Sequence, residues 1–414
     1  MLEAGKDSEK STGLLGWVDE RFPASKLWKE HLSEYYAPKN FNFWYFFGSL
    51  ALLVLVNQLV TGIWLAMYYK PSAADAFASV EYIMRDVQFG WILRYLHSTG
   101  ASFFFIVVYL HMFRGMLYGS YKKPRELLWL IGMGIYLCLM MEAFMGYLLP
   151  WGQMSFWGAK VITSLFEAFP LVGPELVEWI RGDFNISDVV LNRFFALHVI
   201  AIPLVFLLLV WMHIIALHEV GSNNPDGIEI KKNKDKEGKP LDGIPFHPYY
   251  TVKDIFGVGV FLIIFLAVVF FWPDMGGYFL EGPNFEPANP LKTPEHIAPV
   301  WYMTPYYAIL RAIPDKLLGV CAMFAAVLVF CFLPWLDRSP VKSIRYRGGL
   351  YKGMLALFVI SFLSLGYLGL VPPTPLRTIA AQLFSIAYFA FFVLMPIYTK
   401  LDKTKPVPER VTFK

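Results

Sequence analysis

Hydrophobic residues along the chain gather in long runs with few charges, separated by polar stretches. A helix of about 20 apolar residues is long enough to cross a hydrocarbon core of roughly 30 Å. Eight runs meet this length, at residues 43–69, 91–117, 127–149, 189–217, 254–272, 317–336, 350–370 and 378–398. The pattern therefore predicts an all-α, polytopic membrane protein with eight transmembrane helices.

Composition and charge agree with this class. Hydrophobic residues make up 57% of the chain and charged residues 16%, well below the roughly 25% charged share of soluble domains. Cys138, Cys321 and Cys331 all lie inside apolar runs, and the sequence has no CxxCH motif for a covalently attached haem. The net charge of +4 comes from lysines and arginines in some of the loops, so we expect no nucleic-acid partner.

Those loop lysines and arginines also predict the orientation. They concentrate after the second, fourth and sixth runs and in the C-terminal tail, and such loops stay on the cytoplasmic side. We therefore expect both termini in the cytoplasm. Residues 1–40 lack the apolar core of a cleavable signal peptide. They predict an interfacial amphipathic segment that turns four side chains toward lipid, those of Leu14, Leu15, Trp17 and Val18.

The remaining boundaries follow from the runs. We divide the chain into the cytoplasmic-side segment 1–40, spans one to four at 41–228, a lysine-rich cytoplasmic loop and start of span five at 229–253, a four-span region at 254–400, and a basic tail at 401–414. Two long connections, after spans three and five, fall on the periplasmic side. Long loops are usually functional, so we expect a site there that both halves of the chain build.

Histidine spacing in spans two and four carries the chemistry. His97 and His111 are 14 residues apart, and His198 and His213 are 15 apart. Fourteen helical residues make four turns minus about 40° and rise about 21 Å, so each span carries one histidine toward each membrane surface. The two spans run in the same direction, which matches His97 with His198 and His111 with His213. A lone histidine in a span would be interpreted as a packing residue. Two imidazoles at each level are instead typical of a haem that transfers electrons. Structural zinc is less favoured, because it needs four ligands.

Glycines in spans one and three repeat this spacing. Gly48 and Gly62 are 14 residues apart, as are Gly132 and Gly146. Glycine lets a flat macrocycle or another backbone approach closely. The sequence therefore predicts that the first four spans form a di-haem four-helix bundle.

Cations and a proline complete the pattern in these spans. Arg94, Arg114 and Arg193 stand near the histidines at the span ends and suit haem propionates. The alternative is that these cations only extend to the membrane surface.

In span four, a 15-residue spacing offsets the histidines by about +60°. Because Pro203 disrupts the helix, we expect a kink or a one-residue bulge between His198 and Pro203 that realigns them.

Five motifs resemble one family over about residues 15–400: cytochrome b of bacterial quinol–cytochrome c oxidoreductases, respiratory complex III. They are GYLLPWGQMSFWGA (146–159), LHEVGSNNP (217–225), PFHPYYTVKD (245–254), NPLKTPEHIAPVWY (289–302) and YAILRAIPDKLLGV (307–320). The resemblance implies two non-covalent haems b in a multi-pass protein of the bacterial inner membrane. It implies a Q cycle, with quinol oxidation on the periplasmic side, quinone reduction on the cytoplasmic side, and a contribution to the proton gradient.

The family also implies partners and site residues. The partners are a Rieske iron–sulfur protein, cytochrome c1, ubiquinol and ubiquinone, and a second copy of the complex in a homodimer. The low-potential haem would use His97 and His198, the high-potential haem His111 and His213, with Ser120 among the cofactor-binding residues. Quinol oxidation would use Phe144, Tyr147, Gly158, Pro299 and Tyr302, and quinone reduction His218, Ser222, Lys253 and Asp254. A histidine and an aspartate can bind two carbonyls and supply protons.

The chain departs from the family at the quinol site. The usual Pro-Glu-Trp-Tyr motif reads Pro299-Val300-Trp301-Tyr302, so its carboxylate is missing. Glu142 stands in span three, where relatives have a small residue, and a charge inside a span usually marks function. We hypothesise that Glu142 accepts the quinol proton, with Glu295 as the rival. Lys160, where relatives have threonine, has no explanation from the sequence.

Three other protein classes share some of these features. The 15-residue histidine spacing resembles chloroplast-type relatives, but those are split into two chains and carry an extra cysteine-tethered haem, whereas this chain is unsplit and has no cysteine before Cys138. A two-haem anchor of a dehydrogenase or hydrogenase predicts four or five spans and no Pro-x-Trp-Tyr loop. A transporter with proton-relaying histidines predicts no haem, and two b-type redox steps would exclude it.

Overall fold

The computed structural model describes residues 13–29 and 34–413. Within this part of the chain, eight helical segments are long and apolar enough to cross a membrane: Phe43–Ala66, Gly90–Tyr118, Glu126–Leu148, Asp188–Val220, Tyr249–Phe271, Lys316–Leu336, Gly349–Leu370 and Pro375–Val393. They match the eight predicted runs, so the prediction of a helical, multi-pass membrane protein is confirmed. The parts of the 1–40 segment at 1–12 and 30–33, and the last residue of the basic tail, lie outside the described residues.

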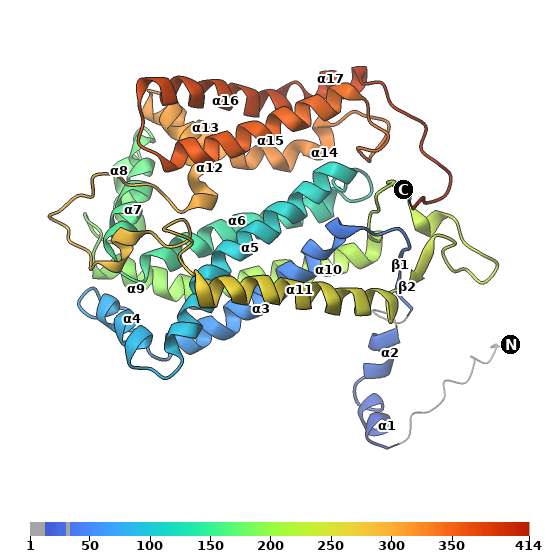
Figure 1. Cartoon of the computed structure of the whole chain (residues 1–414), viewed down its shortest axis with the longest axis horizontal. Coiled ribbons are helices and arrows are strands. Elements are labelled where there is room, and N and C mark those ends of the chain that lie inside the picture. The colour runs from blue at the N-terminus through green and yellow to red at the C-terminus, as the bar shows by residue number, and fades with distance from the viewer. Residues whose placement is uncertain (1–12, 30–33, 414) are drawn as a thin grey trace.

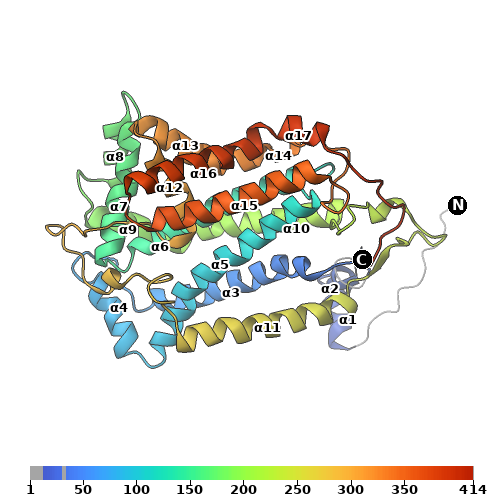
Figure 2. The same cartoon turned by 45° about the horizontal axis from the view of Figure 1, so that its top comes forward.

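The spanning helices lie roughly side by side (Figures 1 and 2). The N-terminal bundle consists of α3 (Phe46–Ala66), α5 (Gly90–Tyr118), α6 (Glu126–Leu148), and α9 (Asp188–Ala196) continued by α10 (Ile202–Val220). The C-terminal half contributes α11 (Tyr249–Phe271), α12 (Thr304–Ala312), α13 (Lys316–Leu328), α14 (Leu333–Leu336), α15 (Gly349–Leu370), α16 (Pro375–Val393) and α17 (Met395–Leu401). In the bundle, α3 packs mainly on α5, and α6 on α10.

Shorter elements mark the two ends of the molecule. One end, which we call the α7 end, carries α4 (Ala76–Arg85), α7 (Gln153–Ser164) and α8 (Gly173–Arg181). The opposite end, the β end, carries α1 (Leu14–Asp19), α2 (Ala24–Trp28), the strands β1 (Tyr36–Pro38) and β2 (Gly243–Pro245), and the C-terminal tail (Figure 1). The strands pair antiparallel, with Ala37 opposite Ile244. Leu14, Leu15 and Trp17 of α1 are exposed and Val18 is half-buried; their contact with lipid stays a prediction.

The fourth span contains the irregularity expected from its histidine spacing. Residues Leu197–Ala201 form a π-helix between α9 and α10, and Pro203 follows it directly in the first turn of α10. A π-bulge inserts one extra residue into an α-helix, so a 15-residue spacing acts as a 14-residue one. The prediction of a bulge between His198 and Pro203 is confirmed.

The long connection after α11 docks on the start of α7 and joins the two halves of the chain. Gly152 bridges with Pro287, and the backbone N–H of Gln153 donates to the Glu286 carbonyl at 2.9 Å. The Asn284 side chain accepts a bond of 2.9 Å from the Ser155 N–H. These contacts fix the loop over the periplasmic ends predicted for spans three and four.

A buried ion pair stabilises the β end. Arg125, which is 2% exposed, donates two hydrogen bonds to the Glu229 carboxylate, of 2.6 and 2.8 Å, and Lys342 contacts the same carboxylate. Burial alone would raise the pKa of Glu229, but the bonds and charges of Arg125 and Lys342 hold it below its usual value. Glu229 is therefore ionised in the folded protein.

Candidate functional site

Two histidine pairs stand one above the other in the N-terminal bundle. The ring centres of His97 and His198 are 6.2 Å apart, and those of His111 and His213 are 6.4 Å apart. Two imidazoles that bind one metal ion from opposite sides, each with a bond of about 2 Å, have ring centres roughly 6 Å apart. The histidines that the sequence pairs by depth therefore lie next to one another, and both spacings fit a shared metal ion.

Each imidazole rests against one of the four predicted glycines. A Cβ atom added at Gly62 would lie 3.2 Å from His97 Cε1, and one at Gly48 would lie 3.4 Å from His111 Cε1. On α6, the corresponding distances are 2.4 Å from Gly146 to His198 and 3.2 Å from Gly132 to His213. The absence of a side chain at each glycine therefore lets a histidine ring pack against the helix backbone. The ring then leaves the space between the helix pairs open.

The second ring nitrogen of the first pair is held in place. His97 Nδ1 lies 2.9 Å from the Thr61 hydroxyl. His198 Nδ1 lies 2.9 Å from the Glu142 backbone carbonyl and 3.0 Å from its carboxylate Oε1. Hydrogen bonds to Nδ1 select the tautomer with a free Nε2. Both rings are thus arranged to bind a metal ion through Nε2.

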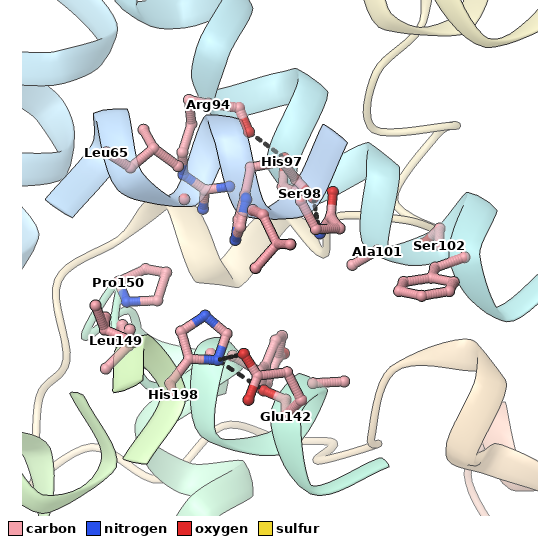
Figure 3. A pocket seen from close by; sticks show the side chains of 18 of the residues that line it. Leu65, Arg94, His97, Ser98, Ala101, Ser102, Glu142, Leu149, Pro150 and His198 are labelled. Atoms are coloured by element: carbon pink, nitrogen blue, oxygen red, sulfur yellow. Dashed lines mark hydrogen bonds and ion pairs between the residues drawn. The ribbon is translucent and has the colours of Figure 1, made fainter. Parts of the chain in front are cut away.

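A cavity surrounds this first pair. Arg94 and His97 face it from α5, and His198 and Glu142 face it from the opposite side (Figure 3). The cavity extends to Tyr147, Val300 and Tyr302, so it reaches from the histidine pair to the Pro-x-Trp-Tyr motif. Two imidazoles, backing glycines and a cation at the rim fit a haem with its propionates.

The other two predicted arginines differ in their surroundings. Arg114 donates to the Asn223 carbonyl at 2.9 Å, and the Asn223 amide donates to the Ser120 hydroxyl at 3.1 Å, so Arg114 and Ser120 are neighbours at the β end. Arg193 is exposed and donates to the Trp179 carbonyl at 2.6 Å. It does not line the cavity, because the guanidinium reaches back to the end of α8.

The predicted quinol residues meet near the α7 end. Tyr302 is buried and stacks on Phe105 with ring centres 3.8 Å apart. A Cβ atom at Gly158 would lie 3.7 Å from the Tyr147 ring, so these two are also neighbours. Phe144 packs against Phe194 instead of lining the cavity. Pro299 is half-buried in the motif itself.

A residue that the sequence did not predict joins this group. The Tyr147 hydroxyl donates to Glu281 Oε2 at 2.9 Å across 134 positions of chain. Burial raises the pKa of Glu281 to about 7, although the bond from Tyr147 lowers it. Glu295, the carboxylate considered as a rival to Glu142, is exposed. The only sequence signal for Glu281 is a carboxylate in the long connection after α11, which several residues share.

The predicted quinone-reduction residues form two groups at the β end. His218 stacks on Tyr35 with ring centres 4.4 Å apart, and the Tyr35 hydroxyl lies 3.2 Å from Ser222 Oγ. On α11, Asp254 accepts a bond of 3.0 Å from Ser49, and the exposed Lys253 lies over the Tyr250 ring at 5.0 Å. Tyr35, which the sequence did not predict, links the first two residues.

Lys160 receives an explanation from the structure. Its ammonium lies 4.8 Å from the centre of the Trp157 ring, where a cation is attracted to the aromatic face. The contact lies within α7 and accounts for a lysine at this position.

Comparison with known proteins agrees with these arrangements. The family model described as Cytochrome b/b6/petB matches residues 32–221, and Cytochrome b(C-terminal)/b6/petD matches residues 287–389. A curated cytochrome b of Allochromatium vinosum is 64% identical and covers 98% of this chain and 100% of its own length. That of Rhodospirillum rubrum is 50% identical, with 96% of each chain covered. A solved structure described as hyperthermophilic respiratory Complex III has a TM-score of 0.87 at 43% identity, and covers 94% of this chain and 99% of its own.

Proposed function

This chain belongs to the cytochrome b family, and we propose that it is the membrane subunit through which a respiratory quinol–cytochrome c oxidoreductase moves electrons across a bacterial inner membrane. Quinol is oxidised at the α7 end, on the periplasmic side, and quinone is reduced at the β end, on the cytoplasmic side, where both termini lie. Together the two events form a Q cycle that contributes to the proton gradient.

The observation that carries this proposal is the presence of two imidazole pairs at two levels of the bundle, with ring centres 6.2 and 6.4 Å apart within the pairs. His97 and His198 would hold a low-potential haem b, and His111 and His213 a high-potential one. When bound, each haem would supply a one-electron redox centre. Thr61 and the Glu142 carbonyl orient the first two rings through Nδ1.

Cations near each level bind the propionates. Arg94 lines the first cavity, and Arg114 with Ser120 stands at the β end. Guanidinium groups bind carboxylates with two parallel hydrogen bonds. Arg193 serves the first haem only if its side chain leaves the Trp179 carbonyl, so we assign the first-level propionates to Arg94.

Quinol binds between Tyr147 and Tyr302, near Gly158 and Pro299, whereas Phe144 supports this region through its contact with Phe194. The two tyrosine hydroxyls can hold a quinol hydroxyl in hydrogen-bond reach, which is the first requirement for proton removal. The cavity joins both tyrosines to the first histidine pair, so an electron has a short path inward. Glu142, which the sequence proposes as the proton acceptor, also lines this cavity.

Quinone binds at the opposite end of the bundle, among residues of α10, of the segment that follows it and of α11, and electrons reach it through the bundle. His218 and Ser222 can donate hydrogen bonds to one carbonyl of the ring, and Lys253, or Asp254 in its protonated form, to the other. Tyr35 stacks on His218 and its hydroxyl lies 3.2 Å from Ser222 Oγ, so an aromatic ring stands beside both of these residues. Protons for the reduced quinone then come from the side that carries the lysine-rich loop.

The partners follow from the reaction. One electron from each quinol leaves through a Rieske iron–sulfur protein to cytochrome c1, and the other crosses the bundle. Ubiquinol and ubiquinone are the substrates, and two copies of the complex form a homodimer. The described residues of this chain contain neither an iron–sulfur motif nor a c-type haem motif, so these centres lie on other subunits.

Redox spectroscopy on the purified complex tests the proposal. We expect two b-type reduction steps in a potentiometric titration. His198→Asn should remove the low-potential step and His111→Asn the high-potential step, whereas His247→Asn, which alters a histidine at the β end outside both pairs, should retain both. A complex without b-type absorption, or two steps that survive both substitutions, would refute it.

A further inference from the structure

The missing carboxylate of the Pro-x-Trp-Tyr motif leaves a gap in proton removal. Val300 lines the cavity at the position where the family has glutamate, and an apolar side chain cannot accept a proton. Oxidation of a quinol releases two protons and two electrons. If the electrons leave to the iron–sulfur partner and the bundle, as proposed above, then the protons still need an acceptor beside Tyr147 and Tyr302.

The docked loop brings a different carboxylate to this place. Glu281 begins the turn Gly282–Phe285, in which the Asn284 N–H donates to the Glu281 carbonyl at 3.0 Å. The Asn284 side chain in turn accepts from Ser155 at the start of α7. The turn therefore has a fixed position over α7, and the Glu281 side chain reaches the Tyr147 hydroxyl at 2.9 Å.

The direction of that hydrogen bond permits a relay. A tyrosine hydroxyl has one proton and two lone pairs. Tyr147 gives its proton to Glu281 Oε2, so its lone pairs stay available to a quinol hydroxyl. Tyr302 lies close enough for the Glu281 charge to raise its pKa further after burial has done so. Tyr147 therefore contacts the carboxylate directly, and Tyr302 lies within range of its charge.

We propose that Glu281 accepts a quinol proton through Tyr147, in place of the carboxylate that Val300 lacks; this rests on the proposed quinol oxidation. The O–H bond of the quinol breaks and its proton goes to the Tyr147 oxygen, while the former Tyr147 proton goes to Glu281 Oε2. Tyr147 ends unchanged, Glu281 ends protonated, and the electrons leave to the iron–sulfur partner and the bundle. Because Glu281 is partly exposed at the α7 end, its proton can then pass to water.

Glu142 is less suited to this step. Its Oε1 lies 3.0 Å from His198 Nδ1, so its carboxyl group already has a partner in an imidazole of the first pair. Glu281 has no such contact among the described residues, and its hydrogen-bond partner is a pocket tyrosine. The geometry therefore separates the two carboxylates, with Glu142 acting on His198 and Glu281 on Tyr147.

Steady-state oxidation of a short-chain quinol by the intact complex, with cytochrome c as acceptor, tests the proposal. We expect Glu281→Gln to lower kcat by about tenfold or more, since a positioned base typically contributes 10²–10⁴-fold. Glu281→Asp should recover part of the rate. Glu286→Gln, which alters an exposed carboxylate in the same loop, is the matched control and should keep the wild-type rate.

A pH profile identifies the group that responds. The titratable groups around Glu281 are Tyr147, which donates a hydrogen bond to it, and Tyr302, on which its charge acts. The wild-type rate should fall below about pH 7 as Glu281 takes up a proton from solvent, and this limb should be absent in Glu281→Gln. A Gln variant that keeps the wild-type rate and limb would overturn the proposal.

Two further readouts separate the possible failures. If the wild-type complex shows b-type spectra but oxidises no quinol, the proposed function fails, not the assignment of Glu281. If Glu281→Gln does not assemble with normal haem content, then Tyr147→Phe tests the same relay, since phenylalanine keeps the ring and removes the hydroxyl. Wild-type kcat in Tyr147→Phe would contradict the proposal, and a comparable loss would support it.

Discussion

The fit between Gly146 and His198 offers the sharpest test of how the first histidine pair is held. A Cβ atom at Gly146 would lie 2.4 Å from Cε1, 2.9 Å from Nε2 and 3.0 Å from Nδ1 of His198. Carbon atoms in good contact are about 3.5–4.0 Å apart, so the ring in Gly146→Ala must retreat by roughly 1 Å. Because the added methyl is fixed to the backbone, the imidazole or the helix has to move.

That retreat acts on the proposed metal-binding atom. The ring is held by the Glu142 carbonyl at 2.9 Å from Nδ1, and a shift of roughly 1 Å exceeds the tolerance of a hydrogen bond. Overpacking of this kind typically costs about 1–3 kcal/mol. We therefore expect Gly146→Ala to lose or weaken the haem held by His97 and His198, and to leave the haem at the other level intact.

Gly134→Ala provides the matched control on the same helix. A Cβ atom there would lie 3.7 Å from Leu209 Cδ1, which is ordinary van der Waals contact. The assay is haem content and potentiometric titration of the purified complex, which separates the two b-type steps. If Gly146→Ala keeps both steps at wild-type potential and stoichiometry, the argument from close packing is refuted.

Three other outcomes follow from the same contacts. Glu142→Gln weakens the acceptor that lies beside His198 Nδ1, which makes this imidazole a poorer electron donor to a bound metal ion, so the midpoint potential of the low-potential haem should rise in a redox titration. An unchanged potential with slowed quinol oxidation would favour Glu142 over Glu281 as the proton acceptor. Arg125→Leu leaves the Glu229 carboxylate buried without its main partner, which should lower the free energy of unfolding by about 3–5 kcal/mol. The Tm of the detergent-solubilised protein should therefore fall, whereas Lys239→Ala, which alters an exposed pair, should leave the Tm unchanged. Because the pKa of Glu229 is depressed in the folded protein, its ionised form stabilises the fold above the unfolded-state pKa of about 4.3, and this stabilisation is lost as the pH falls through the folded-state pKa. The Tm should therefore drop as the pH falls through that range, and it should drop by less in Arg125→Leu.

Much of the bundle could be predicted because a helix is rigid. The spacing of His97 and His111 alone fixes their depth and face, since rise and rotation per residue are constant. The same constancy exposed the mismatch in span four, and the π-helix at Leu197–Ala201 resolves it at the predicted place. Periodicity thus predicted both a regular feature and its one departure.

Arginines could not be placed by the same reasoning. Arg94 and Arg193 each stand a few residues before a histidine, yet only Arg94 lines the cavity. Arg193 instead meets the carbonyl at the end of α8, an acceptor that a long polar connection brings to it. Where a flexible cation points depends on which acceptors the loops supply, and a helical spacing contains no information about them.

The two carboxylates show where such reasoning ends. A glutamate inside an apolar span stands out in the sequence, so Glu142 is an evident candidate. Its partner His198, however, comes from another helix, and this contact changes the role that the chemistry of Glu142 suggests. Glu281 does not stand out, because it lies in a long connection that holds other carboxylates, among them Glu286 and Glu295. Its position depends on Asn284 and the backbone pairing of Gly152 with Pro287, which join segments more than 100 residues apart. The sequence therefore predicts the need for a carboxylate at the quinol site, whereas only the docked loop identifies which one meets Tyr147.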